Sequence, residues 1–306
     1  MRRLAVLLAL AMLSVLFACG QPAAERSASG GGPPPQPYPS PAVLDDQARQ
    51  ALARWAEAVA RHGDQPRFVP IDSGFEVAGD REPEVAENFK LAVSAGQVQA
   101  GPGVLPDGEP GSGQVRWTDG EVVTLPLLSA EATLRAFRDA NSGDCRGCTP
   151  LRVIGARLVD VTVRTDRGPA TAPAWEYSLA GTAARITQVA VDRSAAIAVT
   201  PLPWPANTPP GVRVDSATVA ADGRTVTAHF FGARDGDGPC TSDYTARAAE
   251  SEHAAVIIVE EHPYPAGKVQ PCTAAGFPRT VTAALAAPLG RRTLLDIVGQ
   301  PVPPTR

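Results

Sequence analysis

A nearly continuous apolar run close to the start of the sequence constrains where the rest of the chain can fold. The run extends from Leu4 to Ala18 and follows the basic pair Arg2 and Arg3. It is too short for a helix that spans a bilayer, which needs about 20 apolar residues. A short basic segment followed by an apolar run of this length is typical of a secretory signal peptide. We therefore expect residues 1–18 to be a signal peptide and the remainder to fold outside the cytoplasm.

The end of this apolar run carries a second signal. Its last residues are Leu16-Phe17-Ala18-Cys19-Gly20. The segment resembles the lipobox of bacterial lipoproteins, with leucine at the third position before the cysteine and a small residue directly before it. The resemblance implies a diacylglyceryl group on the Cys19 thiol and cleavage that leaves Cys19 as the first mature residue. Two acyl chains hold a protein firmly to a membrane. The alternatives are an ordinary secretory signal with a chance cysteine and a twin-arginine export signal.

The residues after the signal peptide have the composition of a spacer. Segment 19–40 is rich in Gly, Pro, Ser and Ala, with three glycines and three prolines in succession at positions 30–35. Such a segment buries too little apolar surface to offset the entropy of ordering it. A coil of this length spans about 25 Å. We expect a lipidated tether; the alternative is a proline-rich ligand for a partner's groove.

The part of the chain after the tether is long enough for one large or two modest domains. The formal net charge is −4 and no basic stripe occurs, so no nucleic-acid partner is expected. Lys90 and Lys268 are the two lysines beside many arginines, a bias of GC-rich genomes. The longest later apolar run, Ala254–Val259, is too short to span a membrane and fits a buried strand.

Residues 41–201 predict a first domain of helices and strands. One helix starts at Pro41 after the capping residue Ser40, and a second covers residues 130–140 after Ser129. Apolar residues recur at helical spacing in both. Strands are expected at 67–71, 75–77, 89–93, 114–117, 121–125, 159–163, 175–179 and 186–191.

A proline-rich stretch around residues 201–210 separates this domain from a second one, residues 208–306. Six strands and no helix are expected in it, at 212–219, 225–231, 244–250, 254–260, 280–286 and 293–298. Regular short strands between turns are typical of a sandwich or barrel-like module. The expected fold class is therefore α+β, a helix-plus-sheet domain followed by a β-rich, antiparallel, sandwich-like domain.

Four cysteines remain for disulfides after Cys19. An even number in an exported chain implies disulfides, and four cysteines allow three pairings. We favour Cys145–Cys148 and Cys240–Cys272, because each pair then stays within one predicted domain.

The Cys145-Arg146-Gly147-Cys148 motif is the one stretch with reactive potential. In thioredoxin-like proteins such a motif opens a helix, whose N-terminus lowers the thiol pKa. Here the motif follows a helix and leads into a strand, which favours a structural disulfide. Redox activity is the first alternative, and a metal site is the second.

Other chemistry-bearing residues do not converge in the sequence. His62, His229, His253 and His262 are far apart or at strand ends, and the acidic-glycine turn at 235–238 lacks the later ligands of a calcium loop. No serine-hydrolase, zinc-protease or phosphate-loop motif occurs. We therefore assign no catalytic residue, no metal ligand and no cofactor. A pocket that collects Trp117, Trp175 or Trp204 is the arrangement that would indicate a binding site.

Three fragments of the mature chain, residues 145–151, 173–175 and 288–292, resemble uncharacterised lipoproteins of high-GC Gram-positive bacteria. The resemblance implies a place on the outer face of the cytoplasmic membrane and no particular activity. The leading hypothesis is a non-catalytic, membrane-anchored envelope protein that binds another envelope protein or a wall component, in an oligomeric state that the sequence does not fix. The alternatives are an extracytoplasmic thiol-disulfide oxidoreductase and a hydrolase with a dispersed triad.

Overall fold

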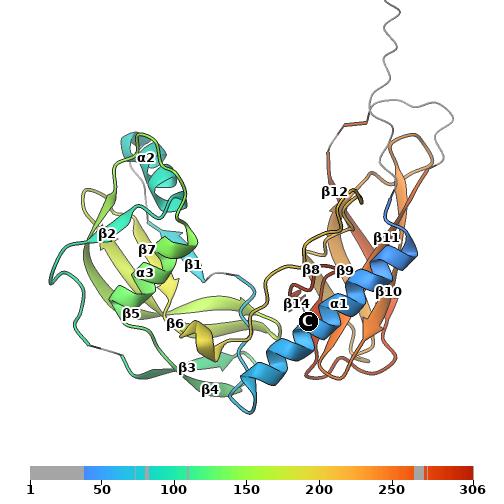
Figure 1. Cartoon of the computed structure of the whole chain (residues 1–306), viewed down its shortest axis with the longest axis horizontal. Coiled ribbons are helices and arrows are strands. Elements are labelled where there is room, and N and C mark those ends of the chain that lie inside the picture. The colour runs from blue at the N-terminus through green and yellow to red at the C-terminus, as the bar shows by residue number, and fades with distance from the viewer. Residues whose placement is uncertain are drawn as a thin grey trace, which may run out of the picture. The chain divides into compact units, whose positions relative to one another are not determined.

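The computed structural model describes residues 38–72, 74–79, 83–108, 110–264, 272–273 and 275–305. Cys19, the signal segment and residues 19–37 of the predicted tether lie outside the described residues. The described chain is an α+β protein with mainly antiparallel sheets (Figure 1), which confirms the expected fold class. None of the described helices combines the length and the apolar character that crossing a bilayer requires.

Residues 67–199, here called the α+β region, are built around one large sheet. Its strand order is β1-β7-β6-β3-β4, and β5 pairs with both β6 and β2. All of these pairs are antiparallel except β2–β5. The strands are β1 (Phe75–Ala78), β2 (Val98–Ala100), β3 (Ser112–Trp117), β4 (Val122–Pro126), β5 (Leu151–Thr165), β6 (Gly168–Leu179) and β7 (Arg185–Val189).

Two helices, α2 (Pro83–Ser94) and α3 (Ala130–Ala140), share a hydrophobic core with this sheet. The hydroxyl of Ser129 accepts a hydrogen bond from the backbone N–H of Ala132, as a helix cap does. Tyr177 on β6 donates its hydroxyl proton to the carbonyl oxygen of Ala130 at 2.8 Å. Trp175 donates its indole N–H to the carbonyl oxygen of Leu128 at 2.9 Å. The start of α3 is therefore fixed to β6 by two side chains of one strand face.

Two expected strands of this region are wrong. The stretch 89–93 lies inside α2, where Phe89 and Ala92 are both buried at helical spacing. The stretch 67–71 forms no strand, because only Pro70 makes a single bridge, with Thr165. Proline has no backbone N–H to continue a ladder.

Residues 212–305, here called the sandwich region, form two sheets with a hydrophobic core between them. One sheet has the order β10-β11-β13 and the other β12-β9-β8-β14. The strands are β8 (Ser216–Val219), β9 (Thr225–Gly232), β10 (Ser242–Glu250), β11 (Ala254–Pro263), β12 (Phe277–Ala284), β13 (Thr293–Leu295) and β14 (Pro304–Thr305). The six predicted strands are confirmed with shifted ends, and β14 was not predicted. The β11–β13 and β8–β14 pairs are parallel, whereas antiparallel pairing was expected throughout.

The last predicted strand of this region, 293–298, ends early at Leu295. The carboxylate of Asp296 accepts hydrogen bonds from the backbone N–H groups of Val298 and Gln300, at 3.1 and 2.8 Å. These bonds close a turn, and the chain leaves the sheet there.

The helix α1 (Pro41–His62) packs on the sandwich region, although it precedes the α+β region in sequence. Ser40 caps it, as expected. Leu44 and Trp55 share a core with Val256 and Ile258 of β11. Residues 254–259 of β11 are all buried, so both faces of this strand need an apolar cover. The opposite sheet covers one face, and α1 covers the other.

Candidate functional site

A groove of about 390 Å³ opens between α2, α3 and the edge strand β1. Its floor and walls combine aromatic and aliphatic side chains with a few polar ones. The described lining residues are Phe75, Val77, Phe89, Lys90, Val93, Ser94, Phe137, Ala140, Asn141, Gln188 and Arg193. A small concave site that is mainly apolar, with a few placed polar groups, is the usual form of a small-molecule site. We call it the aromatic groove.

The pairing of β1 with β7 positions Phe75, one of the two stacked aromatic side chains that line the groove. Phe75 lies opposite Gln188 in the antiparallel register. Its ring stacks on that of Phe137 from α3, with centroids 5.0 Å apart and ring planes 16° apart. The amide of Asn141 donates to the carbonyl oxygen of Phe137 at 2.8 Å and closes the end of the helix. The stacked rings are therefore held from two elements that are far apart in sequence.

The charged side chains among the described lining residues of the aromatic groove are both basic. Lys90 on α2 and Arg193 are both exposed, and no carboxylate occurs among the described lining residues. Arg193 starts η1 (Arg193–Ala195), a short 3-10 helix capped by Asp192. Neither cation makes an ion pair with another described side chain. An apolar ligand with one anionic group therefore finds both an apolar surface and a charge of the opposite sign.

A second groove of about 250 Å³ adjoins the first, and both include Gln188 and Arg193. The Asp72 carboxylate in its wall is occupied, because it accepts from the Gly74 N–H at 3.0 Å and pairs with Arg164 at 3.3 Å. Gly74 has φ of 62°, and a Cβ there would lie 2.4 Å from a methyl group of Val189. The tight approach of this segment to β7 therefore requires glycine. Arg193 remains the one cation of this second groove's described lining.

The disulfide Cys145–Cys148 lies between the end of α3 and the start of β5. No helix begins at either cysteine, so no helix N-terminus is available to stabilise a thiolate. The Asn88 side chain donates to the Thr149 carbonyl oxygen at 3.1 Å and accepts from the Thr149 N–H at 2.7 Å. The loop is thus clamped to α2. Cys240–Cys272 is the second disulfide, and neither disulfide lines a described groove.

The tryptophans proposed as pocket markers do not gather. Trp117 and Trp175 are buried in the core of the α+β region. Trp204 packs beside α1 and donates its indole N–H to the carbonyl oxygen of Pro209 at 2.6 Å. None of the three lines a described groove.

The histidines also remain separate. The ring of His229 is 2.9 Å from the Thr218 hydroxyl, and the ring of His262 is 2.7 Å from the Thr245 hydroxyl. Among the described residues no histidine is hydrogen-bonded to a serine, and no three metal-ligating side chains cluster. Asp235 of the acidic-glycine turn contacts Arg279 at 3.4 Å.

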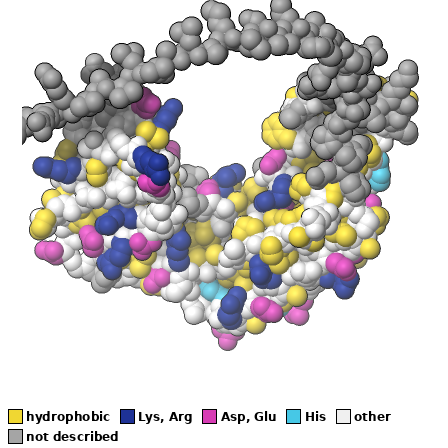
Figure 2. Space-filling view, turned by 45° about the horizontal axis from the view of Figure 1, so that its top comes forward, with side chains coloured by type: hydrophobic (Ala, Val, Ile, Leu, Met, Phe, Trp, Pro, Cys, Tyr) yellow, Lys and Arg dark blue, Asp and Glu magenta, His cyan; other side chains and the backbone are white. Residues whose placement is uncertain are grey.

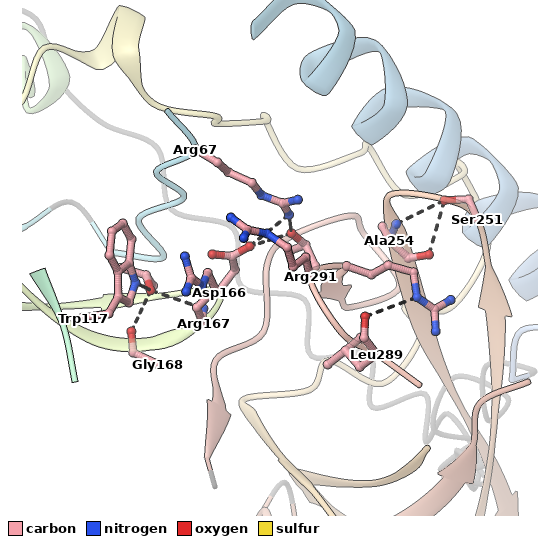
Figure 3. A network of polar contacts seen from close by, with 12 residues as sticks. Arg67, Trp117, Asp166, Arg167, Gly168, Ser251, Ala254, Leu289 and Arg291 are labelled. Atoms are coloured by element: carbon pink, nitrogen blue, oxygen red, sulfur yellow. Dashed lines mark hydrogen bonds and ion pairs between the residues drawn. The ribbon is translucent and has the colours of Figure 1, made fainter. Parts of the chain in front are cut away.

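Burial raises the pKa of Asp166 at the turn between β5 and β6. Arg67 donates to its carboxylate at 3.1 Å and Thr293, on β13 of the sandwich region, donates at 2.6 Å (Figure 3). These two bonds act in the opposite direction on the pKa, but desolvation is the largest cause. A perturbed pKa is a sign of function only where the group reaches a cleft. Asp166 lines no described groove, so its role is to join the turn to β13.

A second polar cluster surrounds this turn. Arg167 contacts Asp119 and Glu121, at 3.0 and 2.7 Å, and lies 4.8 Å from the centre of the Trp117 ring. The hydrogen bond from Arg167 lowers the pKa of Glu121. Across the face seen in Figure 2, acidic and basic side chains are interspersed, without a stripe of one sign.

Comparison with known proteins adds no family. No protein-family model, no curated protein and no solved structure matches the chain. The aromatic groove is therefore assigned from its own geometry. Sequence reasoning missed it because its residues come from five separated elements; the inward position of Phe137 and the rarity of lysine at Lys90 were the only signals.

Proposed function

We propose that the protein is a lipid-anchored, extracytoplasmic binding protein, and that the aromatic groove takes an amphipathic anion. The observation that carries the proposal is the stacked pair Phe75 and Phe137 beside two cations, Lys90 and Arg193, with no described carboxylate in the lining. The ligand class is a small molecule with an apolar body and one acidic group.

Two features support the extracytoplasmic part of the proposal. The disulfides Cys145–Cys148 and Cys240–Cys272 are compatible with an oxidising compartment. The segment that ends in Cys19 has the order of a lipoprotein signal. The site on the outer face of the cytoplasmic membrane is part of the same proposal.

The rival activities have no supporting geometry among the described residues. An oxidoreductase of the thioredoxin type has its cysteine pair at the start of a helix. The Cys145–Cys148 disulfide instead follows the end of α3, and no helix begins there. Neither a thiol-disulfide oxidoreductase nor a hydrolase is therefore proposed as a second function.

A pair of fluorescent probes tests the groove. Anilinonaphthalene sulfonate has an aromatic body and one negative charge, whereas N-phenyl-naphthylamine has a similar body and no charge. Ala140 lines the groove at the end of α3. The substitution Ala140→Trp fills the groove and is expected to weaken both probes about tenfold, a loss of about 1.4 kcal/mol.

The matched control for this variant is Arg135→Trp, on the exposed side of the same helix and outside the groove. It adds the same indole without filling the site. Equal binding by Ala140→Trp and Arg135→Trp would exclude the groove as the binding site.

The anchor has a separate test. Cys19→Ser in the full chain removes the thiol that lipid requires, so the protein is expected to leave the membrane fraction and lose the mass of the acyl chains. Sedimentation of the variant with membranes at the native mass contradicts the anchor.

A further inference from the structure

We propose that one end of the sandwich region docks on the lipid surface that carries the anchor. We call this end the aromatic end and define it by Tyr38, Phe231 and Tyr264. The proposal rests on the proposed lipid anchor, and it adds an interaction surface that is separate from the aromatic groove.

The exposed aromatic side chains of the described residues are confined to this end. Phe231 is 66% exposed, Tyr38 46% and Tyr264 45%. Other large hydrophobic side chains that are exposed are aliphatic and lie on α2, β4 and β5: Leu91, Val122, Ile154 and Leu158. A large aromatic ring that is two-thirds exposed loses most of the stabilisation that burial provides, so its position at the surface suggests contact with a partner.

The three rings come from different elements that meet at this end. Phe231 is near the last residue of β9, Tyr264 follows β11, and Tyr38 precedes α1. The grooves beside Tyr38 and beside Phe231 share a wall made of residues 210–212 and Glu261. Tyr264 donates its backbone N–H to the carbonyl oxygen of Thr241, directly before β10.

The tether enters the folded part at the same end. Tyr38 is the first described residue, and it lines one groove together with Glu261 and His262 of β11. Residues 20–37 are all that separate it from Cys19, and a coil of that length spans about 25 Å. A lipid on Cys19 therefore keeps the aromatic end within reach of the headgroups.

The chemistry of the aromatic end fits a lipid interface. Tyrosine rings concentrate where apolar chains meet headgroups, and an exposed phenylalanine can insert beside them. Charges here have both signs: Arg234 lies over the Phe277 ring and Arg279 over the Tyr244 ring, each at 5.0 Å, while Glu261 is acidic. Binding is therefore expected on zwitterionic phosphatidylcholine and does not depend on anionic lipid.

The experiment uses the mature chain from Cys19 onward with both disulfides formed, which leaves Cys19 as its single thiol. This thiol is coupled to a maleimide lipid in phosphatidylcholine vesicles, so the test does not need natural lipidation. The variant Phe231→Trp adds one indole at the aromatic end. Its matched control, Ile154→Trp, adds one on β5, where Ile154 is 54% exposed.

The added emission is read after subtraction of the spectrum of the wild-type protein. For Phe231→Trp we expect a blue shift on coupling and a loss of emission in vesicles of lipid brominated on its acyl chains. For Ile154→Trp we expect neither change. Equal quenching of the two variants, or none in Phe231→Trp, overturns the proposal.

Two further outcomes are distinguished. A blue shift of Phe231→Trp that grows with protein concentration without vesicles identifies a second copy as the partner and also overturns it. If the Cys19→Ser experiment contradicts natural lipidation, the result with chemically coupled vesicles is unaffected. The lipid anchor and the docking of the aromatic end are therefore tested independently.

Discussion

The sandwich region and the α+β region cover their sheets to different extents. In the sandwich region β11 is buried on both faces, by the opposite sheet on one side and by α1 on the other. In the α+β region the sheet ends in the four-residue edge strand β1, and α2 and α3 leave the aromatic groove beside it. A groove that can hold a ligand is therefore found where helices cover the sheet incompletely. The region whose sheet is covered on both faces is expected to contribute most to stability.

This difference predicts that loss of packing between α1 and β11 has the largest effect on stability. Ile258 is fully buried against α1. Ile258→Ala removes this contact and leaves a cavity, so the free energy of unfolding should fall by about 4 kcal/mol. Urea unfolding measures it. Ile154→Ala, at an exposed position of β5, is the control and should change stability by less than about 1 kcal/mol. Similar losses in both variants would show that α1 is not part of this core.

The two disulfides are expected to contribute unequally to stability, with the larger contribution in the sandwich region. Cys240–Cys272 spans 32 residues of sequence, whereas Cys145–Cys148 spans 3. Chain entropy gives a stabilisation of about 3–4 kcal/mol for the longer loop and about 2 kcal/mol for the shorter one. Unfolding of the two double Cys→Ser variants in denaturant measures the order. A larger loss on removing Cys145–Cys148 would mean that this loop does more than close a turn.

The sequence predicted the sandwich region better than the α+β region, for a physical reason. Its strands are short apolar or alternating runs between turns, and local pattern suffices to find them. The helix that starts at Ala130 and ends near Ala140 was also located, because Ser129 caps it and its apolar face is regular. In α2 the local pattern misled, since the short apolar piece 89–93 fits either a strand or a helix.

Contacts between elements that are far apart in the sequence could not be predicted from the local sequence pattern. The stripe on α1 shows that the helix is amphipathic, but not that it covers β11. Likewise, Phe75 and Phe137 meet only because β1 pairs with β7 and α3 packs on the same sheet. The disulfides followed from the even number of cysteines and from keeping each pair within one predicted domain, whereas the groove depends on contacts between residues far apart in the sequence.

Two neighbouring carboxylates predict opposite pH dependence at the turn between β5 and β6. Burial raises the pKa of Asp166, so its contribution to stability is greatest below the pKa of the unfolded chain and is lost as the pH rises through the folded value. Arg167 lowers the pKa of Glu121, so its contribution is present above the unfolded pKa and is lost as the pH falls. The free energy of unfolding of wild type relative to Asp166→Asn should therefore fall as the pH rises above the ordinary pKa of an aspartate carboxyl, about 3.9.

Relative to Glu121→Gln, the free energy of unfolding of wild type should rise as the pH increases toward the ordinary pKa of a glutamate carboxyl, about 4.3. Thermal or urea unfolding at several pH values gives both slopes. Slopes of the same sign would contradict the assignment of Asp166 as a desolvated carboxylate.

The smallest predicted effect is the loss of probe affinity when the two cations of the aromatic groove are removed. It tests whether the α+β region is the binding region. Anilinonaphthalene sulfonate and uncharged N-phenyl-naphthylamine are titrated against wild type, Lys90→Gln, Arg193→Gln and the double variant. An exposed ion pair contributes up to about 1 kcal/mol, so each single change should weaken the anionic probe about threefold and the double change about tenfold. The uncharged probe should bind all four proteins equally. Unchanged binding of the anionic probe by the double variant, or equal losses for both probes, would contradict an anion site at Lys90 and Arg193.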